Sequence, residues 1–275
     1  MSGATSSVLQ LLCFTVAVSS IPHQVAPRQR WSRLRGGQAA PAAPPDGLSD
    51  DEILERLNNV PTFAILTADN EMISLGGKDL SPWHICYSFF TSAAEVQDLL
   101  RRTIDANPGT DGLHLGTLPL GHAFAQCGGW AQVDGCSAAS EEESKYALQG
   151  PSEGEEAVEA LTADVASGAA MPAALLRDLE ECGVSAGTWL LPVFFSEGFQ
   201  TADMLPAFLS EADFAAGWRR TGREDAERPA ALRVMDVRAL VARMRRGDGP
   251  TSWRKLRLVS TVEAYELAQE LAGDD

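Results

Sequence analysis

Short motifs that mark an active site are scarce in this chain of 275 residues. None of its five cysteines stands in a Cys-x-x-Cys pair, which excludes the thioredoxin-like redox motif and the common zinc knuckle. Its glycines match neither a phosphate-binding loop nor the dinucleotide fingerprint. His84, His114 and His122 could approach a metal together with Cys127, but they lack the short regular spacing of metal ligands. We therefore expect no cofactor, no metal and no enzymatic activity.

Acidic residues are absent from the first 45 positions, although the chain has 38 acidic and 22 basic side chains and a net charge of -16. This segment carries Arg28, Arg30, Arg33 and Arg35, so it is +4 and the remainder is -20. Such asymmetry separates an N-terminal segment from the body of the protein. The acidity of that body also argues against a nucleic-acid partner, because no basic stripe is present to neutralise phosphates.

Long hydrophobic runs are confined to the N-terminus. Val8 to Val18 has the length of a signal-peptide apolar region and is too short to span a bilayer. The Arg-, Ala- and Pro-rich stretch that follows is typical of an organelle transit peptide. We predict a signal peptide at 1–20 and a transit-peptide-like segment at 21–46; the alternative is a plain signal peptide followed by a basic linker. The bipartite reading implies a plastid reached through the secretory route, and the remaining chain would be peripheral to a membrane at most.

A repeat is the main positive feature of residues 47–275. Val60-Pro61-Thr62-Phe63 corresponds to Leu191-Pro192-Val193-Phe194, and Phe90, Ser92 and Ala94 correspond without a gap to Phe208, Ser210 and Ala212. Self-similarity of this kind predicts a pseudo-symmetric fold. The expected fold is a single duplicated α/β (α+β) domain of mixed sheets packed with helices, in a pseudo-two-fold arrangement. We expect repeat 1 at about 50–126, a linker loop at 127–144 and repeat 2 at about 145–275.

Local patterns predict several elements of the first repeat. Ser49 precedes an acidic first turn and is expected to cap a helix, and residues 63–66 and 72–75 suggest a hairpin. A buried strand is expected at 83–90. Ser92 is expected to cap a helix that ends at Asn107 and turns five side chains inward: Ala94, Val96, Leu99, Leu100 and Ile104.

The cysteines leave two questions open. Cys127 and Cys136 flank a Gly-rich loop and could form a disulfide, with two thiols as the alternative. Cys86 lies in a hydrophobic segment and is expected in the core, yet Cys86 or Cys127 could also act as a thiol nucleophile. A nucleophilic cysteine should be partly exposed beside a cationic group, whereas a binding protein should bury its thiols.

Aromatic and aliphatic side chains recur at matched positions of the two repeats. We name Phe90, Leu100, Phe208 and Trp218 as candidate polypeptide-binding residues, on the hypothesis that each repeat leaves an apolar face accessible. The alternative is that these side chains only pack the core.

Several short segments follow one another in a characteristic order: Val60-Pro61-Thr62-Phe63 with Asp69, Phe89-Phe90 before Ser92-Ala93-Ala94-Glu95, Leu118-Pro119-Leu120-Gly121, Leu191-Pro192-Val193-Phe194, and Pro206-x-Phe208-x-Ser210-x-x-Asp213. From about Leu54 to Leu271 the chain resembles the 22-kilodalton subunit family of the translocon at the inner envelope membrane of chloroplasts. The resemblance implies a pseudo-two-fold α/β fold without catalytic residues. It also implies a chaperone-like role in plastid protein import, in the intermembrane space of the envelope.

The partners implied by this resemblance are plastid preproteins with basic transit peptides, and subunits of the envelope translocons. Because such transit peptides are basic and contain few acidic residues, an acidic protein is a reasonable binding partner for them. Two other functions remain as alternatives: an α/β enzyme with a thiol nucleophile, or a structural subunit of an envelope complex.

Overall fold

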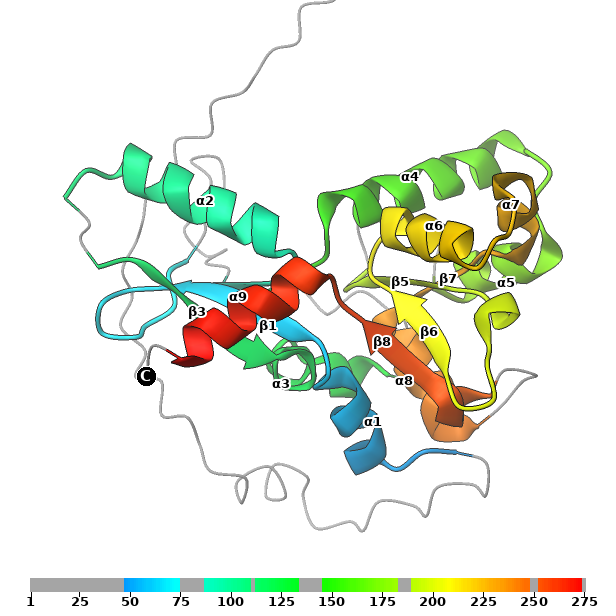
Figure 1. The fold of residues 1–275 in the computed structure, drawn as a ribbon, viewed down its shortest axis with the longest axis horizontal. Coiled ribbons are helices and arrows are strands. Elements are labelled where there is room, and N and C mark those ends of the chain that lie inside the picture. The colour runs from blue at the N-terminus through cyan, green and yellow to red at the C-terminus, as the bar shows by residue number, and fades with distance from the viewer. Residues whose placement is uncertain are drawn as a thin grey trace, which may run out of the picture.

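The computed structural model describes residues 47–74, 87–109, 112–133, 145–182, 189–247 and 252–273. The predicted signal and transit-like segments therefore lie outside the described residues. Two four-stranded mixed sheets form the centre of the molecule, and helices pack on their faces (Figure 1). This arrangement confirms the α/β (α+β) fold class and its two-fold character.

The two sheets have the same topology. Sheet A contains β1 (Pro61–Leu66), β2 (Tyr87–Phe90), β3 (His114–Pro119) and β4 (Tyr146–Gln149) in the order β3-β1-β2-β4. Sheet B contains β5 (Pro192–Phe195), β6 (Leu205–Phe208), β7 (Arg233–Asp236) and β8 (Leu256–Val259) in the order β7-β5-β6-β8. In each sheet the pairs are antiparallel, except the last, which is parallel. Equal order and equal direction are what a duplicated unit produces.

The helices follow the same repeat. The first unit has α1 (Asp50–Leu57), α2 (Ala93–Ala106), α3 (Leu120–Gln126) and α4 (Ser152–Ser167). The second has α5 (Ala173–Cys182), α6 (Glu211–Arg220), α8 (Val237–Arg246) and α9 (Val262–Gly273), with the short α7 (Arg228–Ala231) added before β7. Because β4 pairs with β2 in sheet A, the strand order favours a division of the repeats between α4 and α5 rather than at residue 145.

Serine side chains begin matched helices as the sequence predicted. Ser49 forms a capping box with Glu52 at α1. The Ser92 hydroxyl accepts a hydrogen bond from the Glu95 amide at 3.3 Å, and the Ser210 hydroxyl accepts one from the Asp213 amide at 3.0 Å. A side-chain oxygen at this position satisfies an amide that the helix itself leaves without an acceptor.

The inward face of α2 differs from the expected one. Val96 and Leu99 are buried and Leu100 is half-buried, but Ala94 is exposed and Ile104 is 43% exposed. Ala93 and Thr103 are buried instead, and the Thr103 hydroxyl donates to the Leu99 carbonyl oxygen at 2.8 Å. A buried threonine is tolerated there because its hydroxyl has an acceptor within its own helix.

The expected hairpin in the first repeat is reduced to single bridges. Leu66 pairs with Met72, and Ser74 pairs with Tyr87. Asn70 adopts φ 60° at the turn, a conformation that asparagine tolerates better than most residues. Of the strand expected at 83–90, the described part is β2; residues 83–86 lie outside the described residues.

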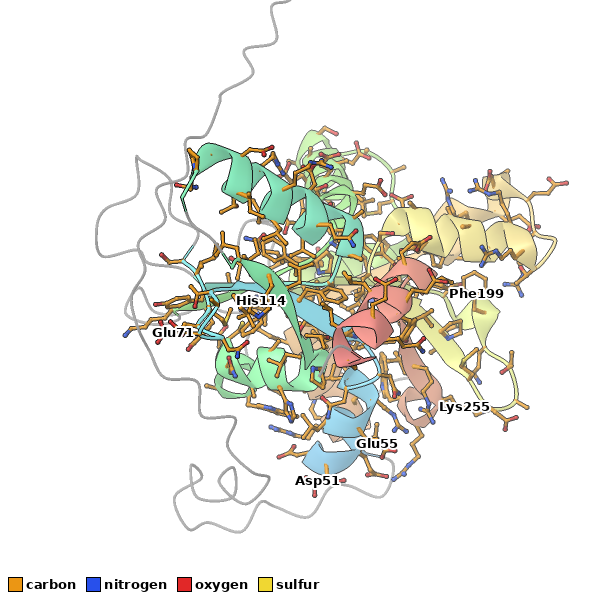
Figure 2. The ribbon with its side chains drawn as sticks, turned by 60° about the vertical axis from the view of Figure 1, so that its left-hand side comes forward. Asp51, Glu55, Glu71, His114, Phe199 and Lys255 are labelled. Atoms are coloured by element: carbon orange, nitrogen blue, oxygen red, sulfur yellow. The ribbon has the colours of Figure 1, made fainter. Side chains whose placement is uncertain are left out.

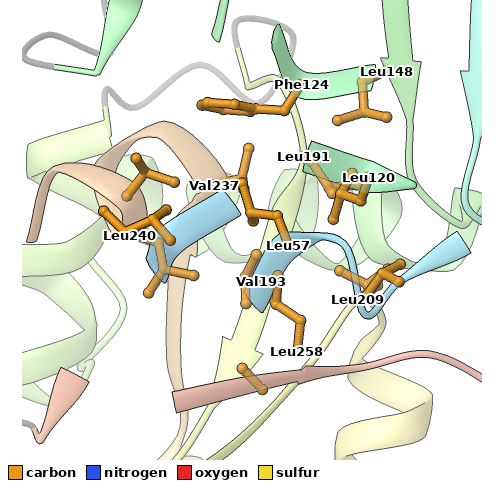
Figure 3. Close-up of a cluster of buried hydrophobic side chains, with 14 of the residues drawn as sticks. Leu57, Leu120, Phe124, Leu148, Leu191, Val193, Leu209, Val237, Leu240 and Leu258 are labelled. Carbon is orange, nitrogen blue, oxygen red and sulfur yellow. The ribbon is translucent and has the colours of Figure 1, made fainter. Parts of the chain in front are cut away.

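A central hydrophobic cluster lies where the two units meet. It contains Leu57 of α1, Leu120 of α3 and Leu240 of α8, together with Val193 of β5 and Leu258 of β8 (Figure 3). All five side chains are at most 3% exposed. Both sheets contribute to one core, so neither unit completes its hydrophobic packing alone.

The last helix of each unit covers the sheet of the other unit. α4 belongs to the first unit by chain order but contacts α6 and β5. α9 belongs to the second unit but contacts α2, β1 and β3 (Figure 1). This exchange leaves each outer sheet face covered by helices of its own unit together with one helix of its neighbour.

Candidate polypeptide-binding surfaces

The outer face of sheet A is covered by α2 and α9. Phe63, Phe90 and Leu115 of the sheet pack with Val96 of α2 and Leu267 of α9 in one cluster. Leu100, Leu113, Ala268 and Leu271 lie partly buried at the border of this cluster. Apolar surface therefore continues from the sheet face to the edges of both helices.

The outer face of sheet B is covered by α4, α5 and α6. Phe199, Phe214 and Trp218 pack edge to face or stacked, with ring centroids 5.3 to 6.0 Å apart. The Arg223 guanidinium lies 4.7 Å from the Trp218 ring, within the range of a cation–π contact. This face is the more aromatic of the two.

The four candidate residues from the sequence occupy matched places on these faces. Phe90 is 5% exposed and Trp218 is 3% exposed, while Leu100 and Phe208 are half-buried. Phe90 and Leu100 lie in the cluster of sheet A, and Phe208 and Trp218 in that of sheet B. Phe90 and Trp218 contribute to core packing, so only the other two present surface that a ligand could reach directly.

Four large apolar side chains in the described residues are more exposed than any of these candidates. They are Ile104 at 43%, Met204 at 40%, Val262 at 66% and Tyr265 at 38%. Ile104 lies on α2, and Val262 and Tyr265 lie on α9, which packs beside α2. Comparison of the two repeats did not indicate Val262 and Tyr265, because α9 belongs to the second repeat although it packs on the sheet of the first. We call Leu100, Ile104, Val262 and Tyr265 the α2–α9 apolar residues.

The exchanged helices have acidic solvent faces. α4 exposes Glu153, Glu155, Glu156 and Glu159, and α9 exposes Glu263, Glu266 and Glu270. Partial desolvation raises the pKa of Glu155, although its side chain reaches solvent, and the charges of Glu95 and Glu159 raise it further. A ligand on either outer face would therefore meet apolar side chains bordered by carboxylates.

The described cysteines are inaccessible. Cys127 is 2% exposed and Cys182 is 0% exposed, and the Cys182 sulfur accepts a hydrogen bond from the Asp236 amide at 3.2 Å. Neither environment resembles the exposed, electropositive surroundings of a nucleophilic thiol. Cys86 and Cys136 lie outside the described residues, and with them the proposed Cys127–Cys136 disulfide.

One motif of serine hydrolases does occur in the chain, where β4 turns into α4. Gly150-Pro151-Ser152-Glu153-Gly154 fits the Gly-x-Ser-x-Gly pattern, which in hydrolases places serine on a strained turn. Ser152 has no positive φ here, and its hydroxyl donates to the Glu95 carboxylate at 2.7 Å rather than contacting a histidine. The Ser152 amide donates to the same oxygen at 2.8 Å. Ser152 thus joins α2 to the start of α4.

Two further features concern metals and membranes. Within the described ranges, no group of three or more His, Cys, Asp or Glu side chains is placed to hold a metal ion. The His114 ring lies between the Gly112 carbonyl and the Asn70 side-chain oxygen, at 3.1 and 3.0 Å. In the same ranges no helix has both the length and the apolar character needed to cross a membrane.

Comparison with known proteins yields a structural likeness only. No family model and no curated protein matches the sequence. Among solved structures, Tic22 from Plasmodium falciparum is 12% identical, with 81% of this chain and 98% of that chain covered and a TM-score of 0.51. Tic22 from Anabaena, described as a protein of protein transport, is 16% identical over 82% of this chain and 98% of its own, with a TM-score of 0.49. The chain therefore has a fold similar to that of Plasmodium falciparum Tic22, as its sequence resemblance implied.

Proposed function

We propose that the protein is a plastid protein-import factor that binds preproteins, in a chaperone-like manner, between the envelope membranes. The fold shared with Tic22 from Plasmodium falciparum carries this proposal, because it extends over 81% of the chain. The N-terminal sequence supports it, since an apolar segment followed by a basic, acid-free one suits a plastid reached through the secretory route. Translocon subunits of the envelope are the expected partners.

The α2–α9 apolar residues are the part of the surface best suited to a preprotein segment. They combine exposed aliphatic and aromatic side chains with the acidic solvent face of α9. A basic transit peptide would be attracted by the carboxylates and held by the apolar contacts. Exposed charges are screened by salt, whereas apolar contacts are not weakened by it.

Binding can be measured by fluorescence anisotropy of a labelled basic transit peptide with the full chain. We expect affinity to fall as the salt concentration rises from about 50 mM to about 500 mM, and to level off at a residual value. Replacing Ile104 and Val262 by serine should weaken the residual binding at least tenfold. Met204→Ser, at the residue directly before β6 of the other sheet, is the matched control and should leave the residual binding unchanged. Absent binding, or binding that ignores salt, would contradict the proposal.

The predicted targeting segments are tested in a separate experiment. The full chain with a fluorescent protein at its C-terminus should accumulate in the plastid, and it should resist protease until the outer envelope membranes are opened. Deleting residues 21–46 should stop the fusion in the secretory pathway, while deleting 1–20 should leave it in the cytosol. Fluorescence of the intact fusion in the cytosol would contradict the proposed plastid location.

A further inference from the structure

Three arginine residues lie where α1 meets sheet B. Arg56 lies on α1, Arg254 on the short 3-10 helix η6 (Trp253–Lys255), and Arg257 on β8, which contacts α1. Glu55 and Lys255 mark the same side of the molecule in Figure 2. We call Arg56, Arg254 and Arg257 the arginine cluster.

Two of these guanidinium groups share one acceptor. Arg56 Nη2 donates to the Arg254 carbonyl oxygen at 2.7 Å, and Arg257 Nη1 donates to the same oxygen at 3.2 Å. The two nitrogens therefore lie within about 6 Å of each other, where like charges repel. The pKa of Arg56 is lowered, first by burial and next by the charge of Arg257. A folded protein holds cations this close only at a cost, unless an anion lies between them.

Carboxylates compensate this cluster only in part. Arg254 Nη1 lies 3.6 Å from Glu52, whose carboxylate already accepts hydrogen bonds from Ser49 in the helix cap. Within the described residues, Arg56 and Arg257 have no carboxylate oxygen within 4.0 Å. The Arg56 Nε atom is buried without an acceptor. Two positive charges thus lack an ionic partner, in a chain whose net charge is -16.

The chemistry of the cluster fits a phosphate group. Guanidinium is planar, always charged and presents paired N–H donors that match phosphate oxygens. A phosphate monoester carries about -1.5 to -2 charges at neutral pH, which corresponds to the two positive charges without an ionic partner, whereas a peptide carboxylate supplies one. Arg254 is exposed and Arg56 and Arg257 are half-buried, so the groups can be reached from solvent.

We propose that Arg56, Arg254 and Arg257 bind a phosphate monoester, presented either by a soluble metabolite or by a lipid headgroup. The proposed site consists of residues of α1, η6 and β8, none of them among the α2–α9 apolar residues, and the proposal does not rest on the protein-import function. Loss of phosphate binding and loss of transit-peptide binding are separate results, because the cluster variants described next remove no carboxylate and no α2–α9 apolar residue and so should not weaken binding of the transit peptide.

The test uses the full chain and two probes. Calorimetric titration with inorganic phosphate reports the soluble source. Flotation with phosphatidylcholine vesicles that contain phosphatidic acid reports the headgroup source, and vesicles with phosphatidylserine control for charge alone. The variant Arg56→Gln/Arg257→Gln removes two charges of the cluster. Arg219→Gln/Arg220→Gln removes two charges from the end of α6 and is the matched control.

We expect one or both probes to bind the unmodified chain, at least tenfold more weakly to the cluster variant, and with unchanged affinity to the control. Binding of phosphate alone would identify a soluble ligand, and binding of phosphatidic acid vesicles alone would identify a headgroup. The proposal is overturned if neither probe binds, if both variants lose affinity equally, or if phosphatidylserine vesicles bind as well as phosphatidic acid vesicles. Should the double variant not fold, Arg257→Lys retains the charge without the forked donors; an unchanged affinity in that variant would also overturn the site.

Discussion

Phe63 on β1 lies directly opposite Phe90 on β2, and the same pair recurs in the other sheet as Phe194 opposite Phe208. In both sheets the pair faces outward, beneath the helix that follows the second strand. The duplicated sequence therefore preserves a cross-strand pair of phenylalanines on each outer face. Such pairs stabilise a sheet through side chains that lie about 4.5 to 5.5 Å apart at their Cβ atoms.

The different burial of Phe90 and Phe208 predicts different roles for these two matched phenylalanines. Phe90→Ala should lower the free energy of unfolding by about 3 to 5 kcal/mol, because the side chain is 5% exposed and leaves a cavity. Phe208→Ala should cost less, since its ring is half-buried. Urea unfolding of both variants measures the difference. If Phe90→Ala kept its stability and lost peptide binding instead, Phe90 would be a binding residue rather than a core residue.

The exchange of α4 and α9 predicts that damage to the end of the chain weakens the first sheet. Leu267→Ala should cost about 2 to 5 kcal/mol, because Leu267 is 7% exposed and packs in the cluster of sheet A. Hydrogen exchange should then speed up in β1 and β3 more than in β5 and β7. Val262→Ala, at a side chain 66% exposed on the same helix, should stay within about 0.5 kcal/mol of the original. Equal protection loss in both sheets would argue against the exchange.

A buried ion pair joins α5 to β7. Arg233 Nε and Nη2 donate to the two Asp178 carboxylate oxygens at 2.5 and 2.8 Å, and Asp178 is 0% exposed. Burial raises the pKa of Asp178, and the hydrogen bonds from Arg233 oppose that rise. Arg233→Met should cost about 3 to 5 kcal/mol, because it removes both of these hydrogen bonds to a buried carboxylate and leaves only Arg243, at 3.7 Å, as an ionic partner.

Replacing Asp178 as well should restore the stability that Arg233→Met loses. In Asp178→Leu/Arg233→Met both charges are gone, so most of the stability lost in Arg233→Met should return. A double-mutant cycle in urea measures this coupling. Simple additivity of the two single substitutions would show that the pair contributes no interaction of its own.

The raised pKa of Glu155 predicts a pH-dependent variant. A carboxyl group whose pKa is higher in the folded state than in the unfolded state destabilises the fold when it is ionised, that is, above its folded pKa. Glu155→Gln should therefore stabilise the protein at pH 7, by no more than about 0.5 kcal/mol because the group is partly solvated. The gain should shrink as the pH falls through the folded pKa and vanish below the unfolded one.

Thermal unfolding of Glu155→Gln across this pH range measures the effect, with Glu156→Gln on the same helix for comparison. A gain in Glu155→Gln that stays constant from neutral to acidic pH would contradict the assignment. An equal gain in both variants would show that the net charge of α4, rather than the position of Glu155, sets the effect.

Local interactions explain why much of the fold could be predicted from the sequence. Ser92 and Asn107 bound α2 as expected, because capping depends on residues three or four positions away. The matched segments around Phe90 and Phe208 predicted two equivalent sheets, and the strand order confirms them. The order of short motifs along the chain also sufficed to indicate the fold that the comparison with Plasmodium falciparum Tic22 shows.

The sequence by itself determined most of the segments that form helices and strands and that they occur twice, since periodicity and caps act over a few residues. Only the tertiary structure decided that β4 completes the first sheet, that α4 and α9 cover each other's sheets, and that Arg56 meets Arg257. It also decided that Phe90 and Trp218 are buried while Val262 and Tyr265 are exposed. These outcomes depend on contacts between residues far apart in the chain, and a pattern within one segment does not contain them.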